Sequence, residues 1–255
     1  MVINALEIVK DIEDHELKGL EKLCFLYRDF EANFHYDPNK GGSFFNRVRQ
    51  IRSNNSSFQE LLKRIDSFYV DLGINPAISF NIATTPRDLE KKFSEEYKKD
   101  IIHVFVYNKD FLNENGSLDK NIDISITQDT DEFGKVFIEV FKNPEEDIET
   151  LKKKIQYNFN FQENLHLVGR YGGQLVGSVG SICFNGVYVI YGLAVREEFR
   201  GNGFGKAIAK VAIKELLKNK PKLIYFKSRN QFIIDSAACF GFEKAYEQIY
   251  FQRIK

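Results

Sequence analysis

The sequence predicts an α+β (mixed α/β) protein, with a mostly antiparallel central sheet flanked by helices and an N-terminal helical or α+β domain. Two turn signals, Gly172-Gly173 and Asn185-Gly186, separate three runs of strand length, as in successive β-hairpins. The third run, residues 187–195, leads through a glycine-rich turn into a segment whose apolar residues have helical spacing. Successive hairpins indicate an antiparallel sheet up to Val195 rather than a doubly wound parallel one.

Length and composition allow a sizeable core and two domains. The chain has 255 residues, of which 43% are apolar and 28% charged, so general disorder is not expected. Its 36 basic and 36 acidic residues cancel, and no global field favours nucleic acid or an anionic membrane. We expect a domain of unknown role over residues 1–120 and a second domain over residues 121–255.

Cysteine usage and the N-terminus indicate a cytoplasmic protein. The three cysteines are far apart and form no Cys/His cluster, so we expect free thiols and no metal. No apolar run approaches the ~20 residues of a membrane span, and the first residues do not resemble a signal peptide. We therefore expect no membrane partner.

The elements of the N-terminal half follow from apolar spacing. Helices are expected over residues 4–26, 58–70 and 87–97, strands over 77–83 and 101–107, a turn over 37–42, and a polar boundary over 108–120. Two interpretations stay open: this half is a degenerate copy of the C-terminal fold, or it is an unrelated extension. Its expected roles are covering a sheet edge, shaping an acceptor cleft, or forming a homodimer.

The elements of the C-terminal half follow in the same way. Strands are expected over residues 122–128, 164–171, 174–184, 187–195, 222–228 and 246–254. One helix is expected to start at Asp129 or Asp131 and end at residue 141, and a second to cover residues 145–157. A third helix is expected to start at Gly205, and a fourth to run from Asn230 to a glycine at position 241.

The junction after Val195 has the composition of an anion site. Glycines at positions 201, 203 and 205 allow close backbone approach, and the following helix leaves N–H groups unpaired at the positive end of its dipole. Ala207 after Lys206 excludes a Walker-type loop, which needs Ser or Thr there. Lys206 in place of a third glycine, with no carboxylate over 222–228, argues against a dinucleotide site and hence against an oxidoreductase.

The Arg-x-x-Gly-x-Gly pattern of Arg200, Gly203 and Gly205, after a strand ending Leu193-Ala194-Val195, resembles the GNAT-type N-acetyltransferase superfamily. The resemblance runs from about Ile122 to the C-terminus. It implies that acetyl-CoA is the co-substrate and that the strand at 222–228 runs parallel to, and splays from, the strand at 187–195. The cofactor-binding residues that it implies are Leu193, Ala194, Val195, Arg200, Gly201, Asn202, Gly203, Phe204, Gly205, Lys206 and Asn230.

The expected reaction is direct transfer of acetyl to a primary amine of a small molecule or peptide. In many family members a tyrosine serves as the general acid, four residues before the glycine that matches Gly241. That position here is Ala237. The strand at 187–195 also lacks a glutamate. Tyr191 is the remaining catalytic candidate, near the reacting carbonyl if its strand is regular, while packing within the sheet is the other interpretation. A lone histidine such as His166 is expected to be structural.

A second function stays open because Ala237 replaces the family tyrosine. The chain would then be a coenzyme A-binding regulatory or interaction protein whose chemistry has decayed. The sequence does not identify the acceptor amine.

Overall fold

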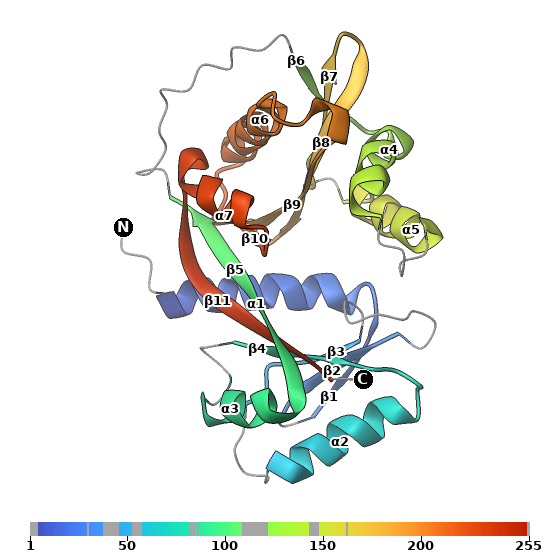
Figure 1. The fold of residues 1–255 in the computed structure, drawn as a ribbon, viewed down its shortest axis with the longest axis vertical. Coiled ribbons are helices and arrows are strands. Elements are labelled where there is room, and N and C mark those ends of the chain that lie inside the picture. Colours follow the sequence, from blue (N-terminus) through green and yellow to red (C-terminus); the bar gives the residue numbers. More distant parts are fainter. Residues whose placement is uncertain are drawn as a thin grey trace. The chain divides into compact units, whose positions relative to one another are not determined.

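The computed structural model describes residues 5–29, 31–37, 46–52, 58–81, 85, 87–108, 122–142, 148–161 and 163–253 (Figure 1). These residues form two compact units. The first unit comprises Met1–Val104, Lys227–Ile234 and Lys244–Lys255, and the second comprises Phe105–Phe226 and Asp235–Glu243. The predicted turn at 37–42 and the boundary at 108–120 lie almost entirely outside the described residues, so the division into domains at residue 120 stays a prediction.

The first unit contains a mixed sheet. Its elements are α1 (Ala5–Glu21), β1 (Phe25–Arg28), β2 (Asn33–Tyr36), β3 (Arg47–Arg49), α2 (Phe58–Val70), β4 (Ala77–Phe80), α3 (Arg87–Glu96), most of β5 (Tyr97–Tyr107) and most of β11 (Phe242–Arg253). The strand order is β1-β2-β3-β4-β11-β5. Strands β1 to β3 are antiparallel, β4 is parallel to β3, and β11 is antiparallel to β4.

Two expectations for this unit need correction. The helix expected over residues 4–26 ends at Glu21, because Phe25–Arg28 pairs with Asn33–Tyr36 as a strand. Strand pairing overrides the helical spacing there. Strands β1, β2 and β3 were not predicted, since runs of three or four residues carry too little alternation to be recognised. The helix at 58–70 is confirmed.

The apolar core of the first unit is largely aromatic. Phe93 and Phe251 are fully buried, and the ring of Phe93 lies 5.1 Å from that of Phe80 and 5.7 Å from that of Phe251. Leu89, Phe93 and Tyr97 are all buried, as the spacing of α3 predicts. The C-terminal strand β11 therefore contributes to the core of the first unit through Phe251.

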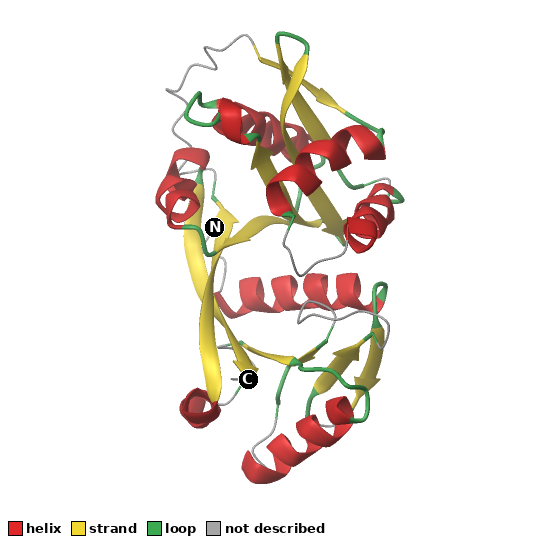
Figure 2. Ribbon diagram, turned by 45° about the vertical axis from the view of Figure 1, so that its right-hand side comes forward, coloured by secondary structure: helices red, strands yellow, loops and turns green. Residues whose placement is uncertain are grey.

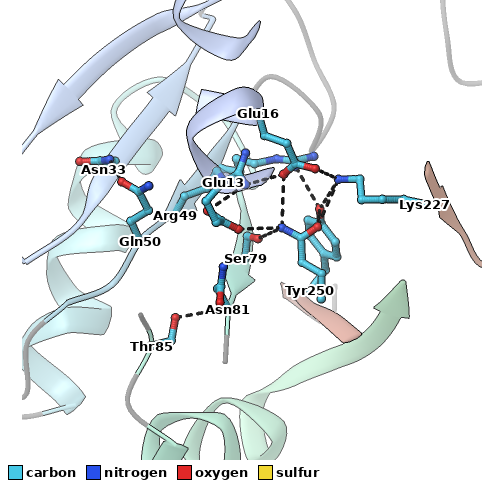
Figure 3. Close-up of polar contacts among 12 residues, drawn as sticks. Glu13, Glu16, Asn33, Arg49, Gln50, Ser79, Asn81, Thr85, Lys227 and Tyr250 are labelled. Carbon is cyan, nitrogen blue, oxygen red and sulfur yellow. Dashed lines mark hydrogen bonds and ion pairs between the residues drawn. The ribbon is translucent and has the colours of Figure 1, made fainter. Parts of the chain in front are cut away.

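A buried ion cluster also lies within the first unit (Figure 3). We define it by Glu13, Glu16, Arg49, Lys227, Gln248 and Tyr250. The Arg49 side chain is only 1% exposed, and its Nη2 lies 3.1 Å from a carboxylate oxygen of Glu13. Such a cluster is costly to desolvate and strongly destabilising to break, because removing one partner leaves a buried charge uncompensated.

The second unit contains the elements expected of the C-terminal half. These are β6 (Ile122–Ile126), α4 (Thr130–Phe141), α5 (Ile148–Phe159), β7 (His166–Tyr171), β8 (Gln174–Phe184), β9 (Val187–Val195), η2 (Glu197–Phe199), α6 (Phe204–Lys218), most of β10 (Leu223–Ser228) and η3 (Ala237–Phe240). The short helix α7 (Gln231–Ser236) begins in the first unit and ends in the second. Strands β6 to β9 are antiparallel, and β10 is parallel to β9. The predicted antiparallel sheet up to Val195 is thus confirmed.

The local signals of this unit are also confirmed. Gly172 and Gly173 have φ of +56° and +81°, and Asn185 and Gly186 have φ of +54° and +74°, as tight hairpin turns require. The Asp129 side chain accepts from two N–H groups in the first turn of α4 and so caps it. The second predicted helix, expected over 145–157, is observed over Ile148–Phe159, with residues 143–147 outside the described part.

Helices cover both faces of the second unit's sheet (Figure 2). Helix α6 packs Ile208 and Ala212 against Leu167 and Val179 on one face. Helices α4 and α5 pack Phe133 and Ile155 against the opposite face, together with Val168. Among the described residues no helix has the length and apolarity to cross a membrane, and no group of three or more metal-ligating side chains gathers.

The same order of elements occurs twice along the chain. Three antiparallel strands, a helix, a strand parallel to the third, a helix and a last strand occur as β1-β2-β3-α2-β4-α3-β5 and as β7-β8-β9-α6-β10-α7-β11. This repetition favours the interpretation of the N-terminal half as a copy of the C-terminal fold over that of an unrelated extension.

Candidate functional site

The parallel pair β9 and β10 separates along its length. The two strands are paired from Leu223 opposite Val187 to Tyr225 opposite Val189. Strand β9 then continues to Val195 and β10 to Ser228 without further pairing between them in the described register. On this side, the backbone N–H and C=O groups of β9 beyond Val189 are therefore not paired by β10.

Strand β9 contains a bulge at its centre. Ser178 is opposite Ala194 and Gly180 is opposite Tyr191, so the single residue between them on β8 faces two residues on β9, Gly192 and Leu193. Gly192 has φ of +62°. The prediction that placed Tyr191 near the reacting carbonyl assumed a regular strand, and this assumption is wrong. The bulge rotates the chain, so Tyr191 packs with α4 and α5 while Leu193 packs with α6.

The bulge lies directly against an aromatic ring. A Cβ added at Gly192 would lie 2.6 Å from Cε2 of Phe137, which is far closer than a carbon contact allows. Gly192 is thus required both by its positive φ and by the ring packed over it. Phe137 of α4 in turn covers the place where β9 departs from regular geometry.

The glycine-rich junction forms the start of α6. Gly201 and Gly203 both have φ of +76°, and Gly203 is the residue that precedes the helix. The first helical hydrogen bond runs from Ala207 N to Gly203 O at 3.1 Å. The N–H groups of the first turn before Ala207 therefore have no acceptor inside the helix, and they sit at its positive end. A Cβ at Gly201 would meet nothing within 4 Å, so the junction is open to an anion.

The side chains of this junction have different environments. Arg200 Nε donates to Val195 O at 3.1 Å, and Asn202 Nδ2 donates to Phe199 O at 3.2 Å. Arg200, Asn202 and Lys206 are exposed, whereas Phe204 is only 4% exposed. Phe204 can therefore offer a ligand only its backbone N–H, while the exposed cations can pair with an anion.

Two further predicted positions lie near α7. Asn230 precedes this helix, and its Oδ1 accepts from Ile233 N at 3.4 Å, as a cap does. Ala237, in the place of the family tyrosine, is 2% exposed and starts η3, which ends at Gly241 with φ of +78°. The predicted glycine at the end of this helix is confirmed. Neither the buried methyl of Ala237 nor its backbone can act as an acid.

Tyr191 is hydrogen-bonded to a histidine that sequence reasoning treated as structural. Its hydroxyl lies 2.9 Å from Nε2 of His166. The two residues flank Gly180 in neighbouring strands, and a Cβ at Gly180 would lie 2.5 Å from the Tyr191 ring. The missing side chain at Gly180 therefore makes room for the pair. No sequence signal could have found this pair, because His166 lies on β7 and Tyr191 on β9, and β8 runs between these two strands.

Burial determines the protonation of this pair. It lowers the pKa of His166 to about 4, and it raises the pKa of Tyr191 well above its usual value. A side-chain hydrogen bond from Asn158 opposes part of the rise in the Tyr191 pKa. At neutral pH the imidazole is neutral and the phenol keeps its proton.

A glycine-rich helix start that follows a bulged strand, beside a parallel strand that separates from it, is the arrangement that the resemblance to the GNAT-type superfamily implied. Residues 131–242 match the model of the Acetyltransferase (GNAT) family. This part of the chain is a GNAT acetyltransferase domain, as the resemblance implied.

Solved structures share the fold at low sequence identity. A GCN5-related N-acetyltransferase from Kribbella flavida is 9% identical, with a TM-score of 0.74 over 100% of this chain and 97% of its own. A functionally unknown conserved protein from Staphylococcus epidermidis is 16% identical, with a TM-score of 0.68 over 89% and 92%. A tandem GNAT protein from the clavulanic acid biosynthesis pathway is 13% identical, with a TM-score of 0.61 over 81% and 74%.

These likenesses establish the fold and leave the substrate open. No curated protein matches the sequence.

Proposed function

We propose that this protein transfers the acetyl group of acetyl-CoA directly to a primary amine. The observation that carries the proposal is the continuity of one segment: the unpaired part of β9, its bulge at Gly192, and the open helix start at Gly201–Lys206 follow one another along the chain. A thioester held along such a segment would place its diphosphate at the helix start and its acyl group near the bulge.

The residues present fit this ligand. The N–H groups in the first turn of α6 lie at the positive end of the helix and suit a diphosphate, as does the open space at Gly201. We assign diphosphate binding to residues 200–206, with side-chain charge from Arg200 and Lys206 and backbone N–H groups from the remainder. Leu193, Ala194 and Val195 would bind the pantetheine amides through their backbone, while the cofactor contact of Asn230 stays a prediction from the resemblance.

Acetyl-CoA supplies an acyl group activated by a thiol leaving group. In the transfer a C–N bond forms and the C–S bond breaks. The amine loses a proton and the leaving thiolate takes one up, so coenzyme A is released as the free thiol. Backbone N–H groups of β9 suit the negative charge that develops on the carbonyl oxygen. We propose Tyr191 as the side chain that donates or relays a proton, since Ala237 cannot.

The same observations leave a second candidate, a coenzyme A-binding regulatory or interaction protein. It is favoured by Ala237 and by the position of Tyr191, whose hydroxyl is already hydrogen-bonded to His166. Both candidates require the same cofactor site, and only turnover separates them.

The cofactor site is tested by calorimetric titration with coenzyme A. Gly201→Glu places a carboxylate among the proposed diphosphate ligands, and we expect the affinity to fall by a factor of about 100 or more. Gly173→Glu is the matched control: φ is +81° there and a Cβ again meets nothing within 4 Å, but the residue lies in a hairpin. Equal affinity in the two variants would overturn the loop assignment.

Turnover is tested by thiol release from acetyl-CoA across a panel of amines. Release that depends on an amine and is lost in Gly201→Glu supports the acetyltransferase. Tight coenzyme A binding with no release for any amine supports the regulatory alternative instead.

A further inference from the structure

A row of aromatic side chains leads from the surface of the second unit to the bulge of β9. We define the aromatic row as Phe133, Phe137 and Phe141 of α4, with Tyr191 of β9. Phe141 is 42% exposed, and its ring lies 5.0 Å from that of Phe137. The Phe137 ring lies 5.8 Å from Phe133 and 6.1 Å from Tyr191. The rings therefore form a continuous apolar surface from solvent to the interior.

The spacing of the row along α4 indicates that it is directed at the bulge. Positions 133, 137 and 141 recur every four residues and lie on one helix face. The middle ring, that of Phe137, packs against Gly192 so closely that no side chain fits between them. Phe133 at the inner end is fully buried and acts as core, whereas the outer two rings are only partly covered.

Two of the three carboxylates within α4 pair with arginines, and the third, Asp131, is exposed in the first turn of the helix. Glu132 pairs with Arg170, and Glu139 pairs with Arg196 at 3.0 Å. Asp129 caps the helix with its side chain. A substrate carrying several positive charges needs free carboxylates to replace its hydration, and the paired and capping carboxylates do not offer them. The part of α4 that carries Phe137 and Phe141 therefore favours an apolar partner.

Resting on the proposed function, we propose that the acceptor is a primary amine carried by an aromatic ring, which packs on Phe137 and Phe141 while its amine reaches the bulge. Offset or edge-to-face packing of rings adds to the free energy of burying the apolar surface. Phe137 then determines specificity, because it is the ring that both contacts the bulge and remains partly uncovered.

The test compares three amines in the thiol-release assay: 2-phenylethylamine, n-butylamine and spermidine. We expect kcat/KM for 2-phenylethylamine to exceed that for the other two by about tenfold or more. Phe137→Ala and the exposed Phe141→Ala should each remove most of this preference by raising KM for 2-phenylethylamine. Phe161→Ala is the control, since the Phe161 ring packs on Tyr157 and Phe184 and keeps the preference intact.

The outcomes separate this inference from the proposed function. Equal or better turnover of spermidine would overturn the aromatic acceptor while leaving the acetyltransferase in place. A preference for 2-phenylethylamine that survives in both Phe137→Ala and Phe141→Ala would overturn the role of the row. Coenzyme A titration of each variant should give the wild-type affinity, and turnover of no amine at all would overturn both proposals.

Discussion

The hydroxyl of Tyr191 lies 2.9 Å from Nε2 of His166, across the space that Gly180 leaves between two strands. Burial keeps the imidazole neutral and the phenol protonated, so the tautomer of His166 sets which of the two groups donates this hydrogen bond, while Asn158 donates a second one to Tyr191. The phenol is thus held in one orientation, on the same face of the sheet as the aromatic row.

Removing this hydroxyl tests the proposed role of Tyr191. Tyr191→Phe should lower kcat by about 10²-fold or more if the phenol transfers a proton. It should also lower the free energy of unfolding by roughly 1–3 kcal/mol, because the buried His166 loses its partner. Acetyl-CoA turnover and thermal unfolding measure the two effects.

A merely structural Tyr191 gives a different result. The loss of stability would remain while kcat stayed at the wild-type value, and the catalytic assignment would then be withdrawn. Since the pKa of His166 is about 4 and that of Tyr191 is raised, we expect no titration of this pair in kcat/KM between about pH 6 and pH 9.

Gly192→Ala tests the bulge. The added methyl would enter the ring of Phe137, and a residue with a side chain is strained at a φ of +62°. Backbone strain costs about 1–2 kcal/mol and overpacking about 1–3 kcal/mol. Chemical denaturation should show the sum of these two costs as a loss in the free energy of unfolding. An acetyl-CoA turnover assay should show a loss of activity.

A double-mutant cycle separates the two contributions. Gly192→Ala in a Phe137→Ala background should recover the overpacking part and leave the backbone strain. Additive effects of the two substitutions would contradict the contact between the ring and the bulge.

The buried ion cluster of the first unit makes a strong stability prediction. Arg49→Ala should lower the free energy of unfolding by about 3–5 kcal/mol, because Glu13 and Glu16 lose a buried partner. The control is Arg28→Ala, which removes an Arg–Glu pair whose arginine side chain is 58% exposed and should change stability by about 0–1 kcal/mol. Similar losses in the two variants would contradict the cluster's importance.

Acid should destabilise the protein in a defined order. Burial lowers the pKa of His166 to about 4, below its value of 6.5 when unfolded. The unfolded chain therefore binds the proton first, and stability is lost as pH falls from about 6.5 towards 4. His35, whose pKa is lowered to about 3 by burial and by nearby arginines, adds to this slope.

Glu16 extends the loss to lower pH. Burial opposes ionisation of this carboxyl, but Lys227 and Arg49 outweigh it and hold its pKa well below 4.5. A carboxylate with a lowered pKa contributes stability that is complete above pH 4.5 and is lost as pH falls below it. Urea unfolding from pH 7 to pH 3 should show a continuous decline.

His166→Gln provides the comparison. Its stability should fall less steeply than that of the wild type between about pH 6.5 and pH 4, by up to about 1.4 kcal/mol per pH unit at the steepest. An unchanged slope would show that His166 already binds its proton in the folded protein.

Sequence reasoning succeeded where the signal is local. The hairpins at Gly172-Gly173 and Asn185-Gly186, the cap at Asp129 and the glycine start of α6 are recognisable because one or two residues dictate the backbone conformation. It failed at β1, whose Phe25–Arg28 segment follows helical spacing until pairing with β2 decides its structure.

By itself, the sequence determined the order of helices and strands in the C-terminal half and the glycine-rich turn that begins α6. Both depend on neighbours along the chain, where spacing and glycine geometry act directly. Only the tertiary structure decided that β9 is bulged at Gly192, that Phe137 covers this bulge, that His166 meets Tyr191, and that β11 completes the first unit's sheet. These features depend on contacts between segments that are distant in the sequence. The free energy that selects each partner comes from burial and strand pairing in the folded chain, and the spacing of residues along the sequence carries no information about it.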